Sequence, residues 1–411
     1  MIGAEKQLLL DMIKCALAQE KYSPKRLDTF LSSNGIPQRS EEYVALISNL
    51  YSFSEAQDLA HIPAEALGSS GAYGLFPETD EGKLKAIKAA FDKALMLCVV
   101  RFVRIDAELK RVSELLENEG IDFIPLKGSV IKTYYKNPKL RTSCDIDVFV
   151  KEEDLDRCDG LFRERLKYTR GNKNVHDVSY HSESGVHIEL HYSLMESYNG
   201  SRSEKKLREV WDYSYKEEGY SHLTRLKGEF FYLYHIAHMA KHVVNGGCGI
   251  KPYMDMLVMK EAGFFDEDKA SALLLECGLQ TFASVQQTLC EVWFCGAEHT
   301  ELTRASEDFI FSGGVYGNLD NYIAMHSAKR GSKLKYILSR IFPTHEELVD
   351  IYPNLRNKKW LTPIYHVRRW THLIIKKGAA KRTISELKRT AAIDKSAANS
   401  AQDFMKALEL I

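Results

Sequence analysis

The feature that most constrains the fold is a change of hydrophobic period in the middle of the chain. Up to about residue 120, apolar side chains such as Leu8 and Met12 recur at helical spacing. Between Ile121 and Leu194 short runs alternate instead, which is typical of strands with one buried face. The helical period returns from Leu226 to about residue 300. The sequence therefore predicts an α+β fold, with a small mixed β-sheet flanked by N- and C-terminal helical regions.

The 411 residues favour two or three domains. Strands are expected at residues 121–126, 144–150, 175–181 and 186–194, with a hairpin turn at 182–185 and a helix at 152–167. We expect an N-terminal helical region (1–95), a sheet domain (96–220), a helical domain that packs on it (221–328), and a basic helical C-terminal region (329–411).

Composition favours a cytoplasmic protein. No apolar run approaches the roughly 18 residues of a membrane span, and the first residues lack the features of a signal peptide. The eight cysteines include no CxxC pair, so we expect reduced and mostly buried thiols.

Acidic side chains in two expected strands point to a metal site. Because side chains alternate along a strand, Asp145 and Asp147 share one face. Adjacent carboxylates repel each other unless a cation lies between them, and Mg²⁺ accepts such oxygens while keeping positions for phosphates. In the later strand Glu189 projects opposite the apolar residues, with His187 and His191 beside it. If the two strands are neighbours, three carboxylates meet around one or two metal ions, Mg²⁺ or alternatively Mn²⁺.

A second group of residues is suited to phosphate. Lys127, Gly128 and Ser129 lie between a strand and a helix, where glycine permits close approach of an anion and a helix N-terminus offers amides. Lys127 and Arg141 would neutralise phosphate charge. Each motif alone also occurs on an ordinary solvated sheet edge; the order of the motifs is more specific.

In this order the segment resembles the nucleotidyltransferase superfamily that shares the polymerase-beta-like palm. More narrowly, the LKG sequence ending at Gly128, Arg141, and the DIDVFV sequence from Asp145 to Val150 resemble an uncharacterised nucleotidyltransferase family of bacteria. That family carries a later DLHW; here Glu189 replaces Asp and Tyr192 replaces Trp. The gap between Gly128 and Asp145 is longer than is usual in the superfamily. The resemblance covers roughly residues 95–370.

The resemblance implies a Mg²⁺-dependent enzyme. It would transfer a nucleoside monophosphate from a nucleoside triphosphate, such as ATP, to an acceptor, which is a small molecule, a protein or RNA, and would release pyrophosphate. A different class is a non-catalytic module that binds a nucleotide or regulates a partner. A third is an enzyme that modifies RNA, for example a tRNA end.

Histidines on a later helix are further candidates. His238 and His242 have the i, i+4 spacing of zinc ligands, but HExxH is absent, which favours a structural or substrate-facing role. The resemblance places them, with Asp255, beside the palm and lining its cleft.

The C-terminal region has an excess of positive charge. Residues 329–390 hold sixteen Lys or Arg and four Asp or Glu, a balance of +12 in a chain of zero net charge. Within it, residues 356–370 mix basic and aromatic side chains, which suits RNA. An amphipathic helix that packs its Trp side chains explains the same pattern.

Overall fold

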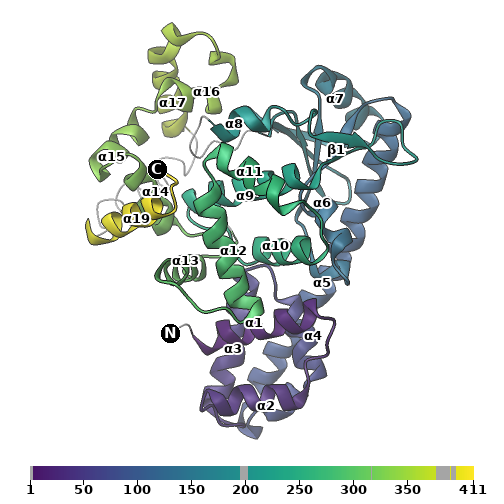
Figure 1. The fold of residues 1–411 in the computed structure, drawn as a ribbon, viewed down its shortest axis with the longest axis vertical. Helices are drawn as coiled ribbons and strands as arrows, with labels where there is room; N and C mark the ends of the chain where they lie inside the picture. Colours follow the sequence, from purple (N-terminus) through teal and green to yellow (C-terminus); the bar gives the residue numbers. More distant parts are fainter. Residues whose placement is uncertain (1–2, 195–201, 316, 376–388, 390–394) are drawn as a thin grey trace.

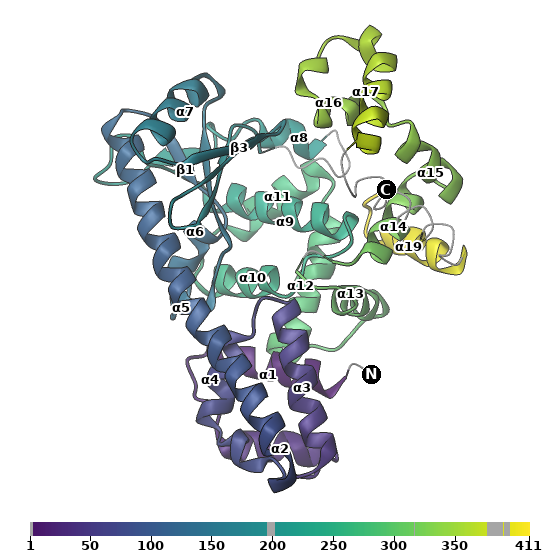
Figure 2. The ribbon, with the colours of Figure 1, turned by 180° about the vertical axis from the view of Figure 1, so that it is seen from behind.

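The computed structural model describes residues 3–194, 202–315, 317–375, 389 and 395–411. A five-stranded sheet and the long helix α5 lie on one side of the molecule, and the C-terminal helices lie on the opposite side (Figures 1 and 2). Helices α9–α13 lie between these two parts. The α+β class predicted from the sequence is confirmed, with the small mixed sheet set between helical regions.

Four helices form the N-terminal bundle and are followed by α5. The first has the predicted amphipathic pattern, and its inner face buries Leu8, Leu9, Met12 and Ile13. Helix α5 has 38 residues and continues through residue 95, where a domain boundary was expected. The bounds are α1 (Ala4–Leu17), α2 (Pro24–Ser33), α3 (Glu41–Ala56), α4 (His61–Ser69) and α5 (Glu81–Asn118).

The sheet has the order β1-β2-β5-β4-β3. Strands β2 and β5 are parallel neighbours at its centre, whereas the other adjacent pairs are antiparallel. The expected hairpin is confirmed as β4 and β5, which turn at Ser182–Gly185. The elements are β1 (Phe123–Pro125), α6 (Gly128–Ile131), β2 (Asp145–Val150), α7 (Leu155–Glu164), β3 (Thr169–Lys173), β4 (Asp177–His181) and β5 (His187–His191).

The two faces of the sheet differ in character. Ile146, Val148 and Ile188 lie in an apolar core shared with α5 and α7. Phe149, on the other face, belongs to the main core, which includes buried residues of α9 and α10. Alternation along β2 therefore places Asp145 and Asp147 on the face turned towards the later helices.

Three details of the expected strands and helices change. Strand β3, fully exposed and with the sequence TRGNK, was not predicted because glycine and asparagine are poor strand formers. Helix α7 is shorter than the expected 152–167. Leu97 and Val103, which give α5 its apparent periodicity, are 49% and 58% exposed, and its buried positions include Phe91, Val112 and Leu116.

The later chain is helical as predicted, apart from a short two-stranded ribbon, β6 (Ser214–Lys216) and β7 (Thr224–Leu226). No described helix is long and apolar enough to cross a membrane. The eight cysteines are free and six are buried, as expected. The helices are α8 (Arg202–Leu207), α9 (Gly228–Val244), α10 (Lys251–Glu261), α11 (Glu267–Cys277), α12 (Gln280–Cys295), α13 (Glu301–Phe311), α14 (Leu319–Lys329), α15 (Lys333–Ile341), α16 (His345–Ile351), α17 (Thr362–Ile375) and α19 (Lys395–Ala407).

Candidate metal and nucleotide site

The three acidic residues singled out in the sequence lie on adjacent strands. Strands β2 and β5 pair in parallel, with Asp147 opposite Glu189 and Asp145 opposite His187. Residues that pair directly across two neighbouring strands project from the same face of a sheet, so these four side chains lie on one face. The Asp147 side chain is 4% exposed, whereas Glu189 is 26% exposed, so one acid is buried and the other reaches solvent.

Two cationic side chains contact the buried aspartate. Lys127 Nζ donates to Asp147 Oδ1 over 2.8 Å, and His191 Nε2 lies 2.7 Å from the same oxygen. His191 Nε2 also lies 3.4 Å from Glu189 Oε2. Among the described residues both contacts of Asp147 use Oδ1, so its second oxygen is available to another ligand.

The electrostatics separate the two aspartates. Burial, together with repulsion from Asp147 and Glu189, raises the pKa of Asp145 to about 6. Burial also opposes ionisation of Asp147, but Lys127 and His191 hold its pKa well below the usual range. Burial disfavours the charged imidazole of His191, yet hydrogen bonds to Asp147 and Glu189 raise its pKa to about 9. The nearby cations therefore do not fully neutralise the acidic side chains of this site.

Two overlapping sets of side chains have the geometry of a metal site. Asp145, His187 and Glu189 form one set, and Asp147, Glu189 and His191 form the other. Within each set the potential ligand atoms lie within 4.8 Å of one another. Glu189 belongs to both sets, as a carboxylate shared by two ions would. This donor set fits a divalent cation.

The expected phosphate cradle is tighter than the sequence suggested. Lys127 has φ +47°, a conformation that glycine adopts more readily. A Cβ on Gly128 would lie 2.1 Å from Ser143 Oγ, so a larger residue here requires the Ser143 side chain to move. Helix α6 has four residues, and the Ser129 and Val130 amides donate to backbone carbonyls. The turn therefore uses the Ser129 and Val130 amides itself. A phosphate-binding role for Lys127, Gly128 and Ser129 stays a prediction.

Arg141 lies in an ion pair with Asp255. Its Nε donates to both carboxylate oxygens over 2.7 and 2.9 Å, and Nη1 donates to the Thr142 carbonyl. Asp255, which is 1% exposed, also accepts from the Tyr135 hydroxyl over 2.7 Å. This contact links the segment before β2 to α10. A phosphate-binding role for Arg141 stays a prediction.

The histidines of α9 contact each other. His242 Nε2 lies 2.9 Å from His238 Nε2, and His238 also packs against Tyr234. Tyr234 interacts electrostatically with Lys127, which places this part of α9 near the acidic site. The role of His238 and His242 in a cleft stays a prediction.

A cluster with no signal in the sequence lies at the start of β2. Asp58, after α3, binds Arg101 Nη2 over 2.8 Å and pairs with Lys251. Lys251 donates to the Thr142 carbonyl over 3.4 Å. These residues lie up to 193 positions apart, and local patterns do not reveal such pairs. The cluster attaches the N-terminal bundle to the segment that carries Arg141.

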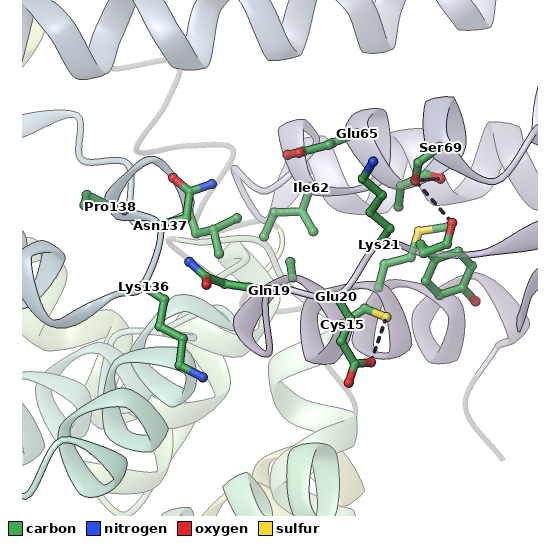
Figure 3. Close-up of a pocket in the computed structure, with 15 residues that line it drawn as sticks. Cys15, Gln19, Glu20, Lys21, Ile62, Glu65, Ser69, Lys136, Asn137 and Pro138 are labelled. Atoms are coloured by element: carbon green, nitrogen blue, oxygen red, sulfur yellow. Dashed lines mark hydrogen bonds between the residues drawn. The ribbon is translucent and has the colours of Figure 1, made fainter.

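Two cavities flank this region. One of about 550 Å³ lies between the N-terminal helices and the loop Lys136–Leu140, with Lys21 and Glu65 on one wall and Asn137 on the other (Figure 3). The second, of about 480 Å³, is lined by residues of α5 and by Cys144 and Val186, which directly precede Asp145 and His187. Both volumes fall in the range of small-molecule sites.

Paired aspartates on one strand and a third carboxylate on the parallel neighbour are the arrangement expected from the resemblance to nucleotidyltransferases. The chain belongs to a family described as uncharacterised nucleotidyltransferase, which matches residues 47–295. No curated protein and no solved structure matches the chain.

The match does not have the expected bounds. It begins within α3 rather than near residue 95, and it ends with α12 rather than near residue 370. The last part of the N-terminal bundle is therefore part of the family's common region, consistent with its ion-pair attachment to the site. The basic C-terminal region lies outside it.

Proposed function

We propose that the protein is a Mg²⁺-dependent nucleotidyltransferase that moves a nucleoside monophosphate from a nucleoside triphosphate to an acceptor and releases pyrophosphate. The observation that carries this proposal is the parallel pairing of β2 and β5. This pairing sets Asp147 opposite Glu189 and brings Asp145, Asp147 and Glu189 together on one face of the sheet. Family membership supports the reaction class.

In this proposal the carboxylates of Asp145, Asp147 and Glu189 hold magnesium. Bound Mg²⁺ would neutralise phosphate charge and orient the reacting oxygens. The imidazoles have other roles, because nitrogen ligands suit transition metals better than magnesium. His191 holds Asp147 and Glu189 in place through its Nε2 atom.

In the same proposal Glu189 is the candidate for proton transfer. Glu189 is 26% exposed. Among the described residues, no cationic group lies as close to Glu189 as Lys127 lies to Asp147. As the alternative to completing the metal site, Glu189 would accept the proton of an acceptor hydroxyl. Lys127, whose pKa is raised by Asp147 despite burial, stays charged beside the phosphates.

The test follows pyrophosphate release and label transfer from nucleoside triphosphates with Mg²⁺ in the wild type, Asp145→Asn and Asp147→Asn. The control is Asp156→Asn, which changes an exposed acid on α7. We expect both strand variants to lose turnover and to bind Mn²⁺ more weakly, while the control keeps both properties. Equal turnover in all four proteins would refute the proposal. Nucleotide binding without pyrophosphate release in the wild type would indicate the non-catalytic module instead.

A further inference from the structure

The C-terminal lobe, defined here as residues 333–375, projects from the body of the molecule (Figures 1 and 2). Helix α17 packs on the end of α15 through one of its faces. Trp370 Nε1 donates to the Ile341 carbonyl over 3.1 Å, and Arg369 Nη2 donates to the Arg340 carbonyl over 3.0 Å. The Phe342 ring meets the Trp370 ring edge-on. The orientation of α17 is therefore fixed.

The opposite face of α17 carries an exposed apolar stripe. Trp360, just before the helix, is 76% exposed, Ile364 is 59% exposed, Val367 is 55% exposed and Ile375 is 81% exposed. Within α17, spacings of three and eight residues keep Ile364, Val367 and Ile375 on one side of the helix. From Ile364 to Ile375 the stripe is about 16 Å long at the rise of an α-helix. An apolar row of this length on a surface indicates a binding partner.

Cations surround the stripe. Residues 333–375 contain eight Lys or Arg and three Asp or Glu, a balance of +5. Arg356, Lys358 and Lys359 are exposed directly before Trp360, and Arg368 is exposed on α17. The partner must therefore offer both apolar contact and negative charge.

We propose that the C-terminal lobe binds the surface of an anionic phospholipid membrane. The stripe would enter the boundary between headgroups and acyl chains, and the flanking cations would lie at the lipid phosphates. RNA fits less well, because the aliphatic side chains of Ile364, Val367 and Ile375 offer no ring on which bases stack. A second copy of the lobe fits less well, because two surfaces of the same charge repel.

The test is co-sedimentation of the full chain with vesicles of phosphatidylcholine, with and without phosphatidylglycerol. We expect binding only to the anionic vesicles, weakened by salt. Ile364→Asp with Val367→Asp should lower the partition coefficient by about tenfold or more, because it removes apolar contact and adds like charge. The matched control is Leu275→Asp, which alters a 61% exposed leucine on α11 and should bind as the wild type does.

Lys358→Glu with Lys359→Glu should weaken binding and reduce its dependence on salt. Failure of the wild type to bind anionic vesicles overturns the proposal, as does unchanged binding by the stripe variant. Binding of an RNA homopolymer that this variant abolishes, without vesicle binding, assigns the lobe to RNA. A mass increase by light scattering that the variant reverses, again without vesicle binding, assigns it to self-association.

Discussion

The ion pair between Arg141 and Asp255 gives the sharpest test of how the site is supported. Asp255→Ala removes a carboxylate whose two oxygens share the single Nε–H of Arg141 and which also accepts from the Tyr135 hydroxyl. The Arg141 side chain is 14% exposed and that of Asp255 is 1% exposed, so neither group regains much water when its partner is lost. Breaking a buried pair from one side costs about 3–5 kcal/mol. We expect a loss of this size.

The assay is urea unfolding followed by circular dichroism for Asp255→Ala, Arg141→Leu and the double variant Arg141→Leu with Asp255→Ala. The double variant should be more stable than Asp255→Ala, because it leaves no unpaired buried charge. It should stay below the wild type, because the Tyr135 hydroxyl loses its acceptor.

The control is Arg163→Met on α7. Arg163 is 60% exposed and forms a 3.4 Å pair with Asp159, so its loss should cost no more than about 1 kcal/mol. A loss below about 1 kcal/mol for Asp255→Ala, or additive losses in the double variant, would contradict the assigned structural role of the pair.

Three further predictions concern single positions. Gly128→Ala should lower the free energy of unfolding by about 1–3 kcal/mol, because the added methyl group meets Ser143 Oγ. Ser143→Ala in the same chain should restore part of this loss. Equal losses with and without Ser143→Ala in urea unfolding would refute the contact. Lys127→Gly should be more stable than Lys127→Ala by about 1–2 kcal/mol. Both variants lack the amine, but only glycine adopts φ +47° without strain. A more stable alanine variant in urea unfolding would show that the turn relaxes. Glu117 accepts amide hydrogen bonds from Ser221, His222 and Leu223, and these bonds lower its pKa against the effect of burial. Its contribution to the free energy of unfolding is therefore complete above the unfolded pKa near 4.5 and is lost as the pH falls through the lower folded pKa. Glu117→Gln should therefore be less stable than the wild type at neutral pH and approach it in acid, and a pH-independent difference in thermal melting would contradict this.

Local alternation was enough to predict β2 and β5 and the side chains that share a face. Asp145 and Asp147 differ by two positions, and a strand places such residues on one face whatever the rest of the chain does. The register that sets Glu189 opposite Asp147 depends on strand pairing, which the sequence does not state. The resemblance to a family with a third acid supplied that step.

Partners of the basic side chains were the hardest feature to predict. Arg141 was expected to hold phosphate, yet 114 positions separate it from Asp255, its partner in the structure. Lys127 was expected at the phosphate as well, and it contacts Asp147. A charge in a sequence has no visible partner, because ion pairs form between segments that only the fold brings together. Leu97 and Val103 show the same limit for apolar residues, since helical spacing does not reveal which face is covered.

Under the proposed function, the charges of the site give a divalent cation a role in the approach of a triphosphate. Asp145, Asp147 and Glu189 bring three negative charges when ionised, and Lys127 and the protonated His191 bring two positive charges. The balance of −1 would repel an incoming polyanion, most strongly where burial limits screening. One divalent ion changes the balance to +1, and a second makes it more positive still. Lys127 and His191 therefore stabilise the folded acids without cancelling their charge, and in the proposed site they leave the second oxygen of Asp147 for a metal ion.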